Sequence, residues 1–196
     1  EEIVTRAAEL GYHHLAVTDH DGLYGALEFA NAADSAGIAP ITGAEMTLLD
    51  GSHITLLVES AAGYANLCRL ITAAHQPEPG TGWPTEPAAR AARLDPSLLA
   101  EHARGLVLLT GCPKGQLSRY VDDGDLISAQ ALLREYVAWF GAGNVYVELQ
   151  QNQVRGDTQR VARLARLAAE ASLPTVATGN VHYHRPERYR LHDVLV

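Results

Sequence analysis

Short hydrophobic runs alternate along the chain with longer stretches in which hydrophobic residues recur every three or four positions. The first pattern is typical of buried strands and the second of amphipathic helices. Strands are predicted at 14–19, 39–43, 54–58, 105–110, 144–149 and 174–178. Helices are predicted at 2–11, 22–36, 62–74, 125–140 and 157–172, with a short helix beginning at Asp95 and Pro96. Since hairpin signals are absent between most strands, the pattern predicts an α/β fold with a parallel sheet closed into a barrel.

Polar residues follow several of these hydrophobic runs directly. The clearest case is the run from Leu15 to Val17, which stops at Thr18-Asp19-His20. In α/β barrels the functional groups lie at the C-terminal ends of the strands. The polar residues at strand ends are His20, Glu45, His53, Cys112, Asn180 and His182, of which His53 stands where strand 54–58 starts. Imidazole, carboxylate and thiolate groups at one rim are typical ligands of a transition metal.

Each of these residues also has an ordinary structural explanation. A histidine after a strand is often a hydrogen-bonded turn residue, and a lone Cys112 is often a small buried hydrophobic side chain. The spacing alone therefore leaves a metal site and a purely structural rim as equal alternatives. Asp19, adjacent to His20, is a candidate to hydrogen-bond a ligand from outside the coordination sphere.

Composition limits the alternatives. A chain of 196 residues with 47% hydrophobic residues can bury one core, which favours a single domain. The net charge of −8 makes this chain alone a poor partner for DNA. Two cysteines form no disulfide framework, which favours a reduced, cytoplasmic location, and no run is long enough to span a membrane.

The chain begins and ends within a helical pattern, so we expect a piece of a longer protein, cut at both ends. The proline-rich stretch 76–93 is predicted to be a surface loop or an insertion.

Several ordered motifs resemble those of the PHP (polymerase and histidinol phosphatase) domain family. They are Thr18-Asp19-His20, Gly43-Ala44-Glu45, His53-Ile54-Thr55-Leu56-Leu57, Thr110-Gly111-Cys112 and Asn180-Val181-His182-Tyr183. The similarity is greatest to the PHP domain of bacterial C-family DNA polymerases of the DNA polymerase III α-subunit type. The stretches 19–22 and 177–184 are more similar to the error-prone branch than to the main replicative one.

The resemblance implies a distorted (β/α)7 barrel whose rim holds up to three divalent metals. It places metal ligands at His20, Glu45, His53, Cys112 and His182. Asn180 stands where metal-binding members have an aspartate, and an uncharged amide is a weaker ligand. The family's first strand, with its His-x-His pair, is not in this chain, so we expect an open edge beside strand 14–19. Weak binding of zinc or manganese at this site is therefore predicted.

Three functions remain open. The preferred one is a structural PHP domain of an error-prone DNA-directed DNA polymerase, acting in replication and damage-tolerant repair synthesis. The others are an active metal-dependent phosphoesterase, either a proofreading 3′–5′ exonuclease or a histidinol-phosphatase-like small-molecule phosphatase. Asn180 counts against the exonuclease.

The polymerase reaction itself is predicted to lie outside this chain, because it needs acidic residues that hold two magnesium ions. Asp122 and Asp123 are interpreted as loop residues and Asp125 as a helix N-cap, so no residue here is assigned a catalytic role. The partners expected by resemblance are the remaining polymerase domains, DNA through the full-length protein, the sliding clamp and other replication or mutagenesis proteins. No membrane partner is expected.

Overall fold

The computed structural model describes residues 1–76 and 91–195. The loop or insertion predicted at 76–93 therefore lies almost wholly outside the described residues. Within the described residues, no helix is long and apolar enough to cross a membrane.

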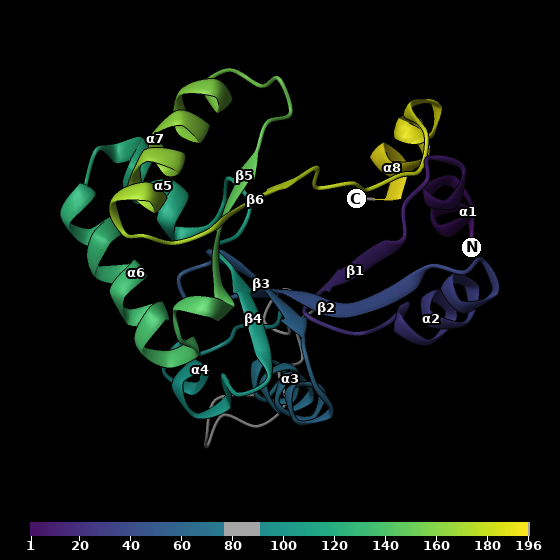
Figure 1. Cartoon of the computed structure of the whole chain (residues 1–196), viewed down its shortest axis with the longest axis horizontal. Coiled ribbons are helices and arrows are strands. Elements are labelled where there is room, and N and C mark those ends of the chain that lie inside the picture. Colours follow the sequence, from purple (N-terminus) through teal and green to yellow (C-terminus); the bar gives the residue numbers. More distant parts are fainter. Residues whose placement is uncertain (77–90, 196) are drawn as a thin grey trace.

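A curled sheet of six strands forms the centre of the molecule (Figure 1). The strands follow chain order across the sheet and are β1 (His14–His20), β2 (Ala39–Thr47), β3 (His53–Val58), β4 (Leu106–Leu109), β5 (Val145–Gln150) and β6 (Thr175–Thr178). Neighbours β1–β2, β4–β5 and β5–β6 are parallel, whereas β2–β3 and β3–β4 are antiparallel. The fold is thus α/β as predicted, but the described sheet is a mixed half-barrel.

The prediction of a parallel sheet is wrong because β2 and β3 form a hairpin and β3 is also antiparallel to β4. The turn between them contains Asp50 and Gly51, and the Leu48 N–H donates to the Ser52 carbonyl over 2.8 Å. Gly51 has φ +73°, a conformation that glycine adopts without steric cost. An Asp-Gly pair between hydrophobic runs is a hairpin signal, and β3 accordingly runs back along β2.

Helices pack mainly on the outer, convex side of the curled sheet (Figure 1). They are α1 (Glu2–Glu9), α2 (Ala26–Ser35), α3 (Ala61–Ala74), α4 (Ser97–His102), α5 (Gln116–Asp123), α6 (Leu126–Phe140), α7 (Asp157–Glu170) and α8 (Tyr189–Leu195), with 3₁₀ turns η2 (Ala142–Asn144) and η3 (Pro186–Arg188). Helix α5 was not predicted. Asp122 and Asp123 end this helix, so their interpretation as loop residues is wrong. Asp125 is the N-cap of α6 as predicted, because its side chain accepts a hydrogen bond from the Ser128 N–H over 3.0 Å.

The core lies between the sheet and these helices. Alternate residues of the strands are fully buried there, including Met46 of β2, Leu56 of β3 and Leu108 of β4. Because successive side chains of a strand point to opposite faces, the residues between them, such as Glu45 and Thr55, face the concave side. Side chains on that side are therefore free to form a site.

Strand β1 is the edge of the sheet and pairs only with β2 among the described strands. The open edge expected beside strand 14–19 is confirmed. A small second core joins α1 and α2 to this edge through Val4, Phe29 and Ile38.

Candidate metal centre

The pairing of the strands brings three predicted ligands to one rim of the half-barrel. His20 ends β1 and lies opposite Glu45 of β2, and His53, the first residue of β3, lies opposite Thr47. Residues two apart on a strand share a face, so Glu45 lies on the same concave face as Thr47 and its partner His53. The hairpin thus carries two of the three ligands.

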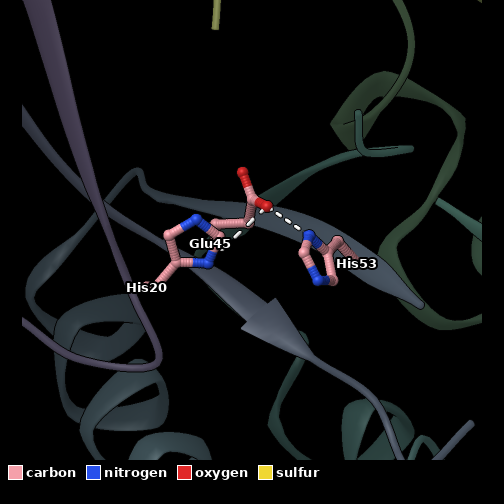
Figure 2. Close-up of side chains that lie close together, drawn as sticks. All are labelled: His20, Glu45 and His53. Atoms are coloured by element: carbon pink, nitrogen blue, oxygen red, sulfur yellow. Dashed lines mark hydrogen bonds and ion pairs between the residues drawn. The ribbon is translucent and has the colours of Figure 1, made fainter. Parts of the chain in front are cut away.

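Glu45 lies between the two histidines (Figure 2). Its Oε1 atom is 2.5 Å from Nδ1 of His53 and 3.7 Å from Nδ1 of His20. The two imidazole rings are edge to face, with centroids 5.5 Å apart. One ligand atom of each residue lies within 4.8 Å of the others, which is close enough for a single metal ion to bind all three. Glu45 and His53 are buried and His20 is exposed.

Cys112 adjoins this group from the end of β4. Its Sγ atom is 3.5 Å from Nδ1 of His53 and 3.7 Å from Oε1 of Glu45. The close approach depends on Gly111, which has φ +92° and where a Cβ atom would lie 2.2 Å from the His53 carbonyl oxygen. Two imidazoles, a carboxylate and a thiol form a donor set suited to zinc.

The charges of the group are strongly coupled. Hydrogen bonds with Cys112 and Glu45 raise the pKa of His53 to about 9, against the opposing effect of burial. Burial alone would raise the pKa of Glu45, but His53, His20 and Cys112 together lower it below its ordinary value. His53 is therefore an imidazolium near neutral pH, and a metal ion that binds there must displace its proton.

Asp21, which the sequence interpretation passed over, fixes the strand that carries Glu45. Its carboxylate accepts hydrogen bonds from the backbone N–H and the hydroxyl of Thr47, over 2.7 and 2.8 Å. Its own N–H donates to the Glu45 carbonyl over 2.8 Å, and its φ is +50°. From the sequence, Asp21-Gly22 indicated a turn after β1 but not this contact with Thr47.

Asp19 accepts a hydrogen bond from the backbone N–H of Gly25 over 2.7 Å, at the start of α2. Its assignment as a residue that hydrogen-bonds a metal ligand stays a prediction.

His182 and Asn180 lie beyond β6, and both are exposed. Among the described residues, the group of closely spaced donors consists of His20, Glu45 and His53, so His182 is not one of its members. The structure thus brings together four of the five predicted ligands, with Cys112 beside the group. The metal roles of all five stay predictions.

Comparison with known proteins identifies the family. Residues 1–152 match the sequence profile of the PHP domain. The chain belongs to the PHP domain family. This PHP domain is 40% identical, over 204 aligned positions that include the whole chain, to the error-prone DNA polymerase of Symbiobacterium thermophilum. It is 37% identical to the error-prone DNA polymerase of Mycobacterium tuberculosis H37Rv over 97% of the chain. It is 31% identical to DNA polymerase III subunit alpha of Treponema pallidum over the whole chain.

These relatives are much longer than the chain, which spans only 17 to 18% of their length. Two solved structures resemble the PHP domain in fold. A candidate metal-dependent phosphoesterase from Bifidobacterium adolescentis has a TM-score of 0.57 at 14% identity, covering 94% of this chain and 82% of that one. An amidohydrolase from Chromobacterium violaceum has a TM-score of 0.52 at 18% identity, covering 94% of this chain and 81% of that one.

Proposed function

We propose that this PHP domain is a structural part of an error-prone DNA polymerase that acts in replication and damage-tolerant repair synthesis. The observation that carries the proposal is the 40% identity to such a polymerase along the entire chain. Nucleotidyl transfer with magnesium takes place in other domains of the same polypeptide. Those domains are its main partners, and DNA, the sliding clamp and other replication or mutagenesis proteins are reached through the full-length cytoplasmic protein.

The rim of the half-barrel holds a single transition-metal ion in this proposal. His20, Glu45 and His53 supply nitrogen and oxygen ligands, and Cys112 supplies a sulfur ligand beside them. This mixture favours zinc, with manganese as the weaker choice. A bound metal ion would act as a Lewis acid. Its main effect here would be to cross-link the ends of β1, β2, β3 and β4 and so stabilise the rim.

Multi-metal hydrolysis is disfavoured by the residues after β6. Asn180 provides an uncharged amide where the resemblance to metal-binding PHP domains implies an aspartate, and His182 lies outside the closely spaced group. A multi-metal site must offset several positive charges, and a neutral ligand does this poorly. A phosphoesterase, such as a 3′–5′ exonuclease, is the second candidate. Two observations support it: the fold that this chain shares with the Bifidobacterium protein, and this chain's own His20–Glu45–His53 group.

The two candidates are separated with the complete polymerase that carries this domain. Primer extension and degradation of a 3′-labelled single strand are measured for the wild type and for a variant carrying both Glu45→Gln and His53→Gln. The structural role predicts that the variant extends primers at the wild-type rate below its melting temperature, with no metal-dependent degradation by either protein. Degradation that depends on metal and is lost in the variant would establish the exonuclease instead.

The matched control for the double variant is His13→Gln, which should behave like the wild type in both assays. His13 is an exposed histidine that precedes β1, at the opposite end of that strand from His20. A further variant, Asn180→Asp, restores the family's charge and is expected to raise zinc affinity about tenfold, or about 1.4 kcal/mol. An unchanged affinity would place residue 180 outside the site.

A further inference from the structure

A second polar group is buried on the concave face, at the ends of β5 and β6. Glu148 and Gln150 are two residues apart on β5 and therefore share a face, and Thr178 of β6 is the register partner of Gln150. Glu148 is 4% exposed and Gln150 is 7% exposed. Burial of a carboxylate at this depth requires compensation by hydrogen bonds or by an opposite charge.

Only one of the two carboxylate oxygens of Glu148 accepts hydrogen bonds from within the group. Oε1 of Glu148 accepts hydrogen bonds from Nε2 of Gln150 over 2.9 Å and from the hydroxyl of Thr178 over 2.5 Å. Nε2 of Gln150 also donates to the Thr178 hydroxyl over 3.0 Å. These bonds hold Gln150 and Thr178 against the carboxylate, so the group is ordered from within.

The other two oxygens have no partner. Oε2 of Glu148 and Oε1 of Gln150 are both fully buried, and neither has a hydrogen-bond donor among the described residues. Both atoms are acceptors, so whatever satisfies them must be a donor or a cation. A buried carboxylate oxygen left unpaired is strongly unfavourable, so the site needs an occupant, and a cation offsets the carboxylate charge where a water molecule does not.

We propose that Glu148 and Gln150 bind a hard divalent cation, Mg²⁺ or Mn²⁺, at a site distinct from the His20–Glu45–His53 centre. The available ligand atoms are a carboxylate oxygen and an amide oxygen, and the side chains offer no nitrogen or sulfur ligand. Magnesium and manganese prefer such oxygen ligands, and magnesium needs only one or two from the protein because it keeps several waters. This inference does not depend on the proposed function.

The site lies at the same rim as the first centre. The backbone N–H of Glu148 donates to the Thr110 hydroxyl over 3.0 Å, two residues before Cys112. In open α/β sheets, ligands bind at the carboxyl ends of the strands, which is where Gln150 and Thr178 lie. In this proposal the half-barrel carries a centre with nitrogen, oxygen and sulfur donors on β1–β4 and a second centre with oxygen donors alone on β5–β6.

The test is a titration of the zinc-loaded protein with Mn²⁺, followed by the electron paramagnetic resonance signal of the free ion. The wild type is expected to bind one Mn²⁺, and Glu148→Gln to bind it at least tenfold more weakly while its zinc content stays unchanged. The control Glu59→Gln removes the same charge from an exposed carboxylate and should bind Mn²⁺ like the wild type. Equal Mn²⁺ affinity in the wild type and Glu148→Gln, or no Mn²⁺ bound by the wild type, would overturn the proposal and leave water as the occupant.

Thermal unfolding separates loss of the ion from loss of the fold. Mn²⁺ should raise the melting temperature of the wild type and of His53→Gln but not that of Glu148→Gln. Without divalent ions, Glu148→Gln should melt no lower than the wild type, because it removes an uncompensated buried charge. Gln150→Met, which removes the second ligand but keeps the carboxylate, should weaken Mn²⁺ binding without abolishing it. If Mn²⁺ raised the melting temperature of Glu148→Gln as much as that of the wild type, the proposed site would be contradicted.

Discussion

At the scale of single residues, the charge on His53 dominates the candidate metal centre. Cys112 and Glu45 stabilise its protonated form and raise its pKa to about 9, whereas the ordinary value is 6.5. Without metal, the imidazolium and the Glu45 carboxylate form a buried ion pair 2.5 Å apart. When an ion binds, Nδ1 of His53 and Oε1 of Glu45 must both turn from this ion pair to the metal.

This raised pKa predicts how stability depends on pH. A group whose pKa is higher in the folded state stabilises the protein fully below its unfolded pKa, and the effect is lost as pH rises through the folded value. The metal-free protein should therefore lose about 3 kcal/mol of unfolding free energy between pH 6.5 and 9.5. Urea denaturation in the presence of a chelator measures this loss. His53→Gln should flatten the profile over this range, and an unchanged slope in the variant would show that another group is responsible.

At the scale of elements, two tight contacts determine how strands and helices fit together. One is the Asp21–Thr47 clamp between β1 and β2. The other is the crossing of Gly63 in α3 with Gly105 before β4, where a Cβ atom on Gly63 would lie 1.7 Å from the Gly105 carbonyl oxygen. Backbone occupies that space, so a side chain fits only if α3 moves.

Gly63→Ala is accordingly expected to destabilise the fold by about 3 kcal/mol, the upper part of the usual range for overpacking. The control is Gly143→Ala, whose Cβ atom would meet nothing within 4 Å and which should change stability by less than about 0.5 kcal/mol. Chemical denaturation of the three proteins makes the comparison. Equal midpoints for the two variants would contradict the close crossing of α3 and the loop before β4.

The elements also show what the sequence could and could not predict. Continuous hydrophobic runs located the six strands, and His20, Glu45 and Cys112 were found because each directly follows such a run. The β2–β3 hairpin was missed although Asp50-Gly51 marks it, because the alternation of strands and helices elsewhere favoured parallel pairing. Helix α5 has only eight residues and is largely polar, so few hydrophobic positions mark it in the sequence, although Leu117 and Val121 are buried on one face.

Contacts between residues that lie far apart in the sequence could not be predicted from it. Glu148 and Thr178 are hydrogen-bonded across 30 positions of the chain, and only the register of β5 and β6 brings them together. The same holds for the orientation of Asp21 toward Thr47. Such pairs depend on the register between neighbouring strands, which no local pattern specifies.

At the scale of the whole molecule, the PHP domain is an acidic half-barrel with β1 at its edge. Its net charge of −8 does not favour the DNA backbone, which agrees with a scaffold more than with a nuclease. An exposed edge strand is a natural place for another strand to pair. The candidate metal centre lies at the end of that edge, where a bound metal ion would tie β1 to the hairpin.

The central claim is that the rim binds one transition-metal ion through His20, Glu45 and His53. The most direct measurement is the zinc content per chain at equilibrium with a buffered excess of zinc, by equilibrium dialysis and elemental mass spectrometry, for the wild type and Glu45→Gln. We predict one zinc in the wild type and a content close to zero in the variant. Two or three zinc ions in the wild type, or one zinc retained fully by Glu45→Gln, would contradict the account.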